Sequence, residues 1–504
     1  MGAAVPARVA VAPGGGGGND GGFIVPGTSG GIGGGVGATS GASPRSGSGQ
    51  GGSGGFGGGG GGGGDTQGPG SGVGGAGGFG GGGGGGGGVG GFGGGGGGGA
   101  GSFSPDTSGQ PGASGGFGAG AGGNGGMPGS TRAGGGGGGG GAGLGGAVFV
   151  QQGGSLTLAG SFSVNGNIVT GGNGGQAGLG ESNAKPATTG GQGAAFGSGM
   201  FLQGNGTLTF TPGSNLSQSI SDVIADQTGV GGTGANAGSW RLRLNGAGTL
   251  VLAVADTYSG GTIIDAGLLR LGSGGSLASG GDLIINGGTF DLNGRNQIVG
   301  DLSGAGGALA LGSGTLTAGT ADTTAFAGAI SGGGLFVKIG AGTLTLTGAS
   351  NYTGGTVIAG GTLQLGDGGA AGSITGAVID NGGLAIDRSD IFTLAAAVGG
   401  SGAFHQIGTG TTILTAADSV AGGTMISAGT LELGTGGSIA GNVTFAGVGA
   451  ATTLRLDTGT NQLGGGIGGF AVGDGIDLAF VSFDPSLSAI WQENASNTGG
   501  CCRW

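Results

Sequence analysis

The chain has 504 residues, of which 163 are glycine, and its formal net charge at pH 7 is −11. With 11 prolines and no strict Gly-X-Y period it is not a collagen, and glycine at this level disfavours helices, because it costs about 1 kcal/mol relative to alanine in a helix interior. Lys185 and Lys338 are the only lysines, so no basic face can form and we expect no nucleic-acid partner.

The first 145 residues are of low complexity. Uninterrupted glycine runs cover residues 57–64, 81–88, 93–99 and 134–141. Such runs have no side chains to bury and lose the most backbone entropy on ordering, so we expect residues 1–145 to be disordered. The alternative is that glycine-rich strands or packed polyglycine layers form and dock on the domain that follows. No signal peptide is predicted, because Met1–Pro13 has Arg8 in its middle and lacks an apolar core.

A domain made of strands is expected over residues 146–483. The triplet Gly-Thr-Leu, or a close variant, occurs three times, and each time a second copy follows 19 residues later. The pairs begin at Gly248 and Gly267, at Gly342 and Gly361, and at Gly410 and Gly429. A spacing near 20 residues is about the length of one coil of a β-solenoid, so the repeat predicts an all-β solenoid.

The three copies share one internal order. A Leu-X-Leu or similar step stands at each triplet, as in Leu344/Leu346, and alternation places both leucines on one face of a strand. A Gly-Gly pair between the triplets permits the positive φ angles of a tight corner. We therefore predict strand, corner, short strand, corner and strand in each copy, with leucines of successive coils stacked inward. At roughly 20 residues per coil, about 16–17 coils would form.

The second copy is the most complete. Gly340–Gly348, followed by Asn351–Thr356 and Ala359–Gly366, resembles the passenger-associated transport repeat of bacterial autotransporter passenger domains. Similar repeats lie near residues 246–272, 340–366 and 408–434. The resemblance implies a right-handed parallel β-helix at the cell surface, in association with the outer membrane, or outside the cell. It also implies export by a signal peptide and a C-terminal outer-membrane β-barrel translocator, which we expect to be absent from this chain.

Residues 484–504 are expected to be a C-terminal tail from a truncated or frame-shifted reading frame, so that the chain is a fragment of a longer protein. Cys501 and Cys502 are the only cysteines, and their adjacent placement departs from the composition of the rest of the chain. A metal or redox site is the alternative, but no further cysteine or histidine lies nearby in the sequence.

Few residues could carry chemistry. His405 is the only histidine, and we expect it to face solvent instead of serving a catalytic triad. Asp387–Asp390 is the densest charged cluster, for which a polar corner is expected and a catalytic groove is the alternative. Gly473–Leu478 echoes one turn of a calcium-binding roll, and we expect a turn followed by a strand. Tyr258 and Tyr352 share one repeat position, which favours packing over ligand contact.

These observations predict no catalytic, cofactor-binding or metal-binding residues, and no cofactor. The leading hypothesis is a non-enzymatic, adhesin-like surface passenger that presents an elongated β-helix to a host or neighbouring cell surface, through protein or glycan. Two alternatives stay open: a polysaccharide-active β-helix enzyme, and a structural glycine-rich matrix protein in which residues 1–145 carry the function.

Overall fold

The computed structural model describes residues 53, 73–102, 108–127, 133–178, 186–447, 451–459, 462–482, 490–493 and 500–503. The chain divides into two compact units, which are described separately below. The glycine-rich unit comprises Met1–Gly154, Val164–Asn205 and Asp222–Ser239, and the solenoid unit comprises Ser155–Ser163, Gly206–Ser221 and Trp240–Trp504.

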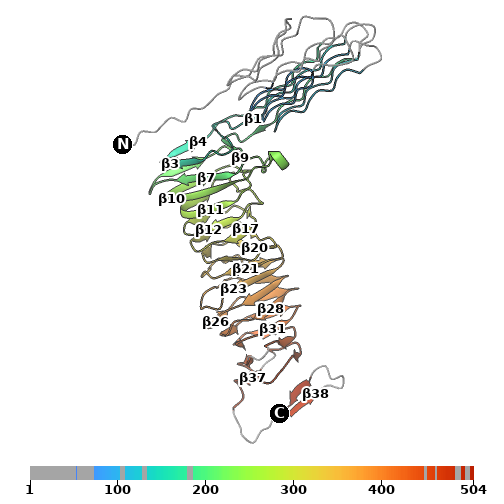
Figure 1. The fold of residues 1–504 in the computed structure, drawn as a ribbon. Coiled ribbons are helices and arrows are strands. Elements are labelled where there is room, and N and C mark those ends of the chain that lie inside the picture. The colour runs from blue at the N-terminus through green and yellow to red at the C-terminus, as the bar shows by residue number, and fades with distance from the viewer. Residues whose placement is uncertain are drawn as a thin grey trace. The chain divides into compact units, whose positions relative to one another are not determined.

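The solenoid unit winds through four parallel sheets, and strands of different sheets alternate along the chain (Figure 1). Sheet 1 contains β3 (Leu156–Ala159), β4 (Phe162–Val164), β7 (Gly206–Thr211), β8 (Ser217–Ile220), β10 (Trp240–Leu252), β11 (Thr262–Leu271), β12 (Leu283–Ile285), β13 (Thr289–Asp291), β15 (Leu302–Ser303), β16 (Ala308–Ala310) and β19 (Ala329–Ser331). Sheet 2 contains β14 (Gln297–Ile298), β17 (Thr315–Ala318), β20 (Leu335–Lys338), β22 (Thr356–Ile358), β24 (Val378–Asp380), β27 (Val398–Gly400), β30 (Ala417–Val420) and β33 (Ser438–Ile439).

Two further parallel sheets complete the coils. Sheet 3 contains β18 (Thr324–Phe326), β21 (Thr343–Leu346), β23 (Thr362–Leu365), β25 (Gly383–Ile386), β28 (Ala403–Gln406), β31 (Thr424–Ile426), β34 (Val443–Phe445) and β36 (Ile467–Gly468). Sheet 4 contains β26 (Ile391–Leu394), β29 (Thr411–Leu414), β32 (Thr430–Leu433), β35 (Thr453–Leu456) and β37 (Gly475–Leu478). An antiparallel hairpin, β38 (Ile490–Glu493) and β39 (Gly500–Arg503), lies at the C-terminal end of the sequence.

The register confirms the predicted stacking of leucines. Leu250 pairs with Leu269, and Leu344 pairs with Leu363, so residues 19 apart occupy adjacent coils. All four leucines are buried, at most 2% exposed, and burial of each side chain stabilises the core by about 1.5–3 kcal/mol. The all-β parallel solenoid predicted from the triplets is therefore confirmed.

The solenoid has about 13 turns, fewer than the 16–17 predicted. The difference arises in the first turns, because Leu156 on β3 pairs with Leu208 on β7, and Leu208 in turn pairs with Leu242 on β10. These partners are 52 and 34 residues apart in sequence, since the intervening segments 164–205 and 222–239 belong to the other unit. Later coils keep spacings near 20.

The corners need glycine where it was predicted. In each repeat the second glycine of the Gly-Gly pair has a positive φ: 85° at Gly261, 93° at Gly355 and 82° at Gly423. Residues with a Cβ rarely adopt this conformation, so the glycine pair allows the chain to turn tightly between strands.

The glycine-rich unit is held by backbone hydrogen bonds with a period of three residues. The amides of Gly83 and Gly86 donate to the carbonyls of Gly95 and Gly98, and further rows repeat this step. Three residues per turn is the period of a polyproline II helix, whose backbone groups point outward and can bond to neighbouring helices. The described part of residues 1–145 therefore forms packed polyglycine layers, the alternative to a disordered coil, whereas residues 1–52 and 54–72 lie outside the described residues.

At many positions these layers leave no room for a side chain. A Cβ placed on Gly95 would lie 1.8 Å from the carbonyl oxygen of Gly139, and one on Gly98 would lie 1.9 Å from that of Gly136. The long glycine runs are thus explained by close contact between backbones. The hydrogen bonds between these backbones compensate for the conformational entropy lost on ordering.

Short strands and phenylalanine rings complete this unit. Its strands are β1 (Gly143–Leu144) with β5 (Ala195–Phe196), and β2 (Val148–Val150) with β6 (Met200–Leu202) and β9 (Ile224–Asp226); a single 3₁₀ turn, η1, covers Gly234–Asn236. Phe92 stacks on Phe79 at 5.3 Å and on Phe117 at 5.2 Å between ring centroids. Phe79, Phe92 and Phe117 therefore form a shared apolar core, with Phe117 packed on Phe201.

Candidate functional site

The charged cluster Asp387–Asp390 is held together by Arg388. The Arg388 guanidinium pairs in a bidentate manner with Asp390, Nε to Oδ1 at 2.9 Å and Nη2 to Oδ2 at 2.8 Å. It also donates to the carbonyls of Gly372 and Ala370, and it lies 4.6 Å from the centroid of the Phe392 ring. Arg388 is 8% exposed, and its contacts with Gly372 and Ala370 attach the 366–372 loop to the next coil.

The Arg388 geometry also affects the carboxylate beside it. The hydrogen bond from Arg388 holds the pKa of Asp390 below its ordinary value. A general acid needs a pKa that is raised toward neutrality. The pKa of Asp390 is shifted in the opposite direction, so Asp390 is not suited to act as a catalytic acid. The arginine donors used here are also unavailable to an anionic substrate.

His405 lies on the outward side of β28, between the buried side chains of Phe404 and Gln406. Its neighbours in the adjacent coils are Ala385 and Met425, neither of which can complete a catalytic triad. The structure therefore places His405 on a partly exposed outer column and brings no nucleophile beside it within these strands.

The segment Gly473–Leu478, which resembles one turn of a calcium-binding roll in sequence, forms a structural turn followed by a strand. Asp474 Oδ1 accepts hydrogen bonds from Thr452 N and Thr452 Oγ1, and Oδ2 accepts one from Ala471 N. Asp477 instead faces Arg455 on the outer face of β35, at 3.7 Å. The two carboxylates are thus engaged with different partners and do not form a shared site.

Tyr258 and Tyr352 are core residues. They are 1% and 0% exposed, and each hydroxyl pairs with a buried threonine four residues later. The oxygen–oxygen distance is 2.7 Å from Tyr258 to Thr262 and 2.6 Å from Tyr352 to Thr356. Packing was the favoured interpretation of these tyrosines, and neither can contact a surface ligand from this position.

The sequence analysis missed two buried carboxyls, Asp380 between the second and third repeats and Asp418 within the third. Asp380 is 0% exposed and Asp418 2% exposed, and one oxygen of each carboxyl accepts a backbone amide, from Gly382 and Val420 respectively. The other oxygen of each has no hydrogen-bond partner among the described residues, and neither has the hydroxyl of Thr424. Burial raises the pKa of Asp418 to about 6, with repulsion from Asp380 adding to it, and burial also raises the pKa of Asp380.

The alignment of the three repeats contains a signal for the burial of Asp418. Asp418 stands two residues before Val420, just as Asp256 and Ser350 stand two residues before the buried tyrosines. Alternation along a strand puts residues two apart on one face, so burial of Tyr352 implies burial at the Asp418 position.

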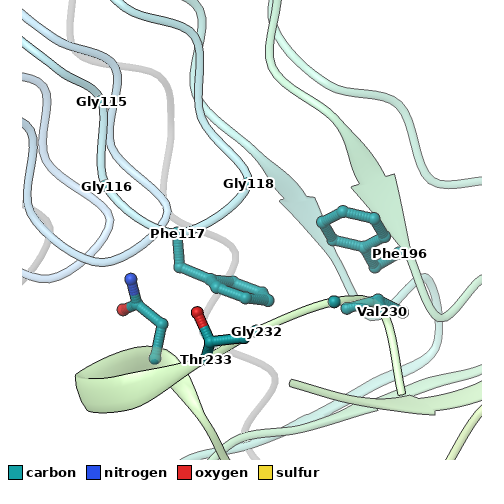
Figure 2. A pocket seen from close by; sticks show the side chains of 10 residues that line it. Gly115, Gly116, Phe117, Gly118, Phe196, Val230, Gly232 and Thr233 are labelled. Atoms are coloured by element: carbon teal, nitrogen blue, oxygen red, sulfur yellow. The ribbon is translucent and has the colours of Figure 1, made fainter. Parts of the chain in front are cut away.

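A pocket of about 340 Å³ lies within the glycine-rich unit (Figure 2). Phe117, Phe196 and Val230 provide its apolar wall, and Thr233 and Asn236 lie at its polar side, with glycine backbone between them. The rings of Phe117 and Phe196 are 5.8 Å apart at 44°. None of the lining residues is charged, so the pocket has no group for acid–base chemistry.

Two further observations concern metal and membrane. Across the described ranges, no three or more His, Cys, Asp or Glu side chains are grouped as they would be around a metal ion. No helix in the same ranges has the length and apolar character needed to cross a membrane.

Comparison with known proteins agrees with this architecture. Residues 242–271, 336–365 and 404–433 match the model of the passenger-associated-transport-repeat family. The chain is also similar to the Adhesin BmaC autotransporter of Brucella suis biovar 1 (strain 1330), with 37% identity over 147 residues. That match covers 25% of this chain and 4% of the relative, so the chain spans only a small part of the relative's length. No solved structure matches.

The fold and the repeats together define a parallel β-solenoid that is similar to autotransporter passenger domains. The resemblance seen in the sequence is confirmed, and each matched segment begins four residues earlier than the repeat predicted from its triplets. Most of the additional residues belong to the strands that enter each repeat, β10, β20 and β28.

Proposed function

We propose that this chain is a non-enzymatic, adhesin-like passenger segment that is displayed at the cell surface or released from it. One observation carries the proposal: the side chains that the sequence offered as candidates for chemistry form contacts that hold the coils together. Arg388 binds Asp390 and two carbonyls, Asp474 caps a turn, and Tyr352 is buried against Thr356. What remains for contact is a long outer surface of repeated strands.

The comparisons support the same proposal. Passenger-associated transport repeats cover three coil pairs, and the similar relative carries the name adhesin. A solenoid exposes equivalent side chains at each coil, so weak contacts repeat along its length and their effects combine. The proposed partner is a host or neighbouring cell surface, through protein or glycan.

Two measurements test the proposal. Cells with and without the gene are compared for labelling by an antibody against residues 240–447 and for attachment to a cell monolayer. We expect labelling of intact cells, its loss after external protease, and weaker attachment without the gene. Cells that label only after permeabilisation would contradict display.

The enzyme alternative is tested on the purified chain. Incubation with polygalacturonate and other polysaccharides should release no new reducing or unsaturated ends. Turnover that disappears in the Asp387→Ala, Asp390→Ala variant would show that the chain is an enzyme.

A further inference from the structure

Two neighbouring extended segments of the glycine-rich unit, residues 171–178 and 186–196, which we call the ladder strands, have an outer face that carries uncharged polar side chains. Gly190 N donates to Gly175 O at 3.0 Å, and Gly193 N donates to Gly172 O at 2.9 Å, which makes the strands antiparallel. This register places Asn173 opposite Gln192 and Gln176 opposite Thr189. The Gln192 Nε2 to Asn173 Oδ1 distance of 3.4 Å agrees with it.

The period of three explains why these four positions carry side chains. A Cβ on Gly171 would lie 1.8 Å from Gly193 O, and one on Gly174 would lie 1.9 Å from Gly190 O. Gly190 and Gly193 are equally close to the layer beneath, at 1.9 Å from the carbonyls of Gly138 and Gly141. Asn173, Gln176, Thr189 and Gln192 occupy a different position of each turn, which is exposed; the exposed Thr188 stands in a third row, with Gly191.

We call Asn173, Gln176, Thr189 and Gln192 the amide ladder. All four are exposed, and along each strand they are three residues apart, about 9 Å in polyproline II geometry. Within the described strands, Gln176 and Thr189 make no side-chain hydrogen bond, and the single contact between Asn173 and Gln192 leaves further donors and acceptors unused. The glycines between them leave the face unobstructed.

Charge decides which partner fits this face. Residues 73–102, 108–127, 133–178 and 186–205 contain no Asp, Glu, Lys, Arg or His. Among these residues a nucleic acid or an acidic polymer finds no cation to pair with, and a basic protein finds no carboxylate. Glu181 and Lys185, which stand between the two strands in the sequence, lie outside the described residues. Amide and hydroxyl groups offer both donors and acceptors, as the hydroxyls of a neutral polysaccharide require.

We propose that the amide ladder binds an uncharged polysaccharide laid across the two strands. Asn173 and Gln192 contact one sugar position, and Gln176 and Thr189 contact the next along the chain. The proposal rests on the proposed function only for access to such a polymer, because binding is a property of the isolated chain.

The test uses the purified full-length chain and insoluble cellulose, chitin and cross-linked dextran, with cross-linked polygalacturonate as the acidic comparison. We expect retention on at least one neutral polymer, unchanged between 50 and 500 mM NaCl because no ion pairs contribute. Asn173→Ala with Gln192→Ala should lower the retained fraction about tenfold, and Gln176→Ala with Thr189→Ala should do the same, as expected for the loss of about one net hydrogen bond.

The control is Asn351→Ala, which removes an exposed asparagine from the solenoid unit and should leave retention unchanged. Because the ladder side chains are exposed, the double variants should unfold at the same denaturant concentration as the parent chain. The proposal would be overturned by no retention on any neutral polymer, by double variants that are retained as well as the parent chain, or by retention only on polygalacturonate that falls with salt. Surface labelling is measured separately, so failure here would leave the passenger assignment intact.

Discussion

The hydroxyl of Tyr352 lies 2.6 Å from Oγ1 of Thr356 inside the solenoid, where both residues are at most 1% exposed. The same pair occurs one repeat earlier as Tyr258 and Thr262. In the third repeat Val420 replaces the tyrosine, and the equivalent threonine, Thr424, has no partner for its hydroxyl among the described residues. At this repeat position the threonine hydroxyl is therefore hydrogen-bonded in the first two repeats and lacks a partner in the third.

This difference predicts opposite effects for one substitution at two equivalent sites. Thr356→Val should destabilise the chain by about 1–3 kcal/mol, because the Tyr352 hydroxyl would be buried without a partner. Thr424→Val should be neutral or stabilising, because it removes a buried hydroxyl that already lacks one. Urea unfolding of the two variants measures both, and equal losses would show that the pairing is unimportant.

The buried Asp418 predicts an unusual dependence on pH. Its folded pKa of about 6 lies above the ordinary value of 3.8, so the folded state binds the proton more tightly than the unfolded chain does. The contribution of Asp418 to the free energy of unfolding is therefore complete below about pH 4 and is lost as pH rises to about 6. The total change is on the order of 2–3 kcal/mol. Asp380, whose pKa is also raised by burial, adds to the same trend, and His405 opposes it.

Asp418→Asn checks this pH dependence. The free energy of unfolding of the parent chain should fall between pH 4 and pH 6, and the variant should lose most of that slope. Asp322→Asn removes an exposed carboxylate and is the control, which should keep the parent slope. A variant with the full parent slope would mean that Asp418 is not the group responsible.

Arg388 predicts a local effect on one loop. Replacement by lysine keeps the charge but loses the planar fork that reaches Asp390 and two carbonyls together, so we expect a loss of about 2–3 kcal/mol. Hydrogen exchange should become faster first at residues 366–372, which the guanidinium holds. Unchanged exchange in this loop would contradict the role assigned to Arg388.

The polyglycine layers predict a sharp contrast between two glycines of similar surroundings. Gly98→Ala should disrupt the layers, because its Cβ would lie 1.9 Å from Gly136 O. Gly138→Ala should be tolerated, since its nearest neighbour is 3.8 Å away and alanine lowers the entropy of the unfolded chain. Protease resistance of residues 73–146 in the two variants distinguishes them, and equal sensitivity would contradict the packing.

The coil register could be predicted from sequence because buried leucines alternate with more polar residues, and this alternation recurs at a fixed spacing. Leu344 and Leu363 share a triplet and a spacing, so their stacking follows from alternation alone. The glycine-rich unit was harder, since a run of identical residues has no such contrast. Only in its outer strands, as at Asn173 and Gln176, do side chains reveal the period of three.

The local polar contacts could not be predicted in the same way. Arg388 reaches carbonyls 16 and 18 residues earlier, and this contact depends on how far the 366–372 loop bends back. Burial of Asp418 could have been inferred from its alignment with Ser350, but the sequence analysis made no prediction for it, because a carboxylate is rare in an apolar core. Such cases depend on tertiary packing, which outweighs residue type.

The central claim is that residues 19 apart stack in adjacent coils, and cross-linking tests it most directly. Thr345 and Gln364 are paired on the outer side of β21 and β23, and parallel neighbours lie about 4.8 Å apart, within reach of a disulfide. In a background with Cys501→Ser and Cys502→Ser, the Thr345→Cys, Gln364→Cys variant should cross-link rapidly under mild oxidation. Thr343→Cys with Gln364→Cys, two residues out of register, should not. Equal cross-linking of the two variants, or none in the first, would contradict the solenoid.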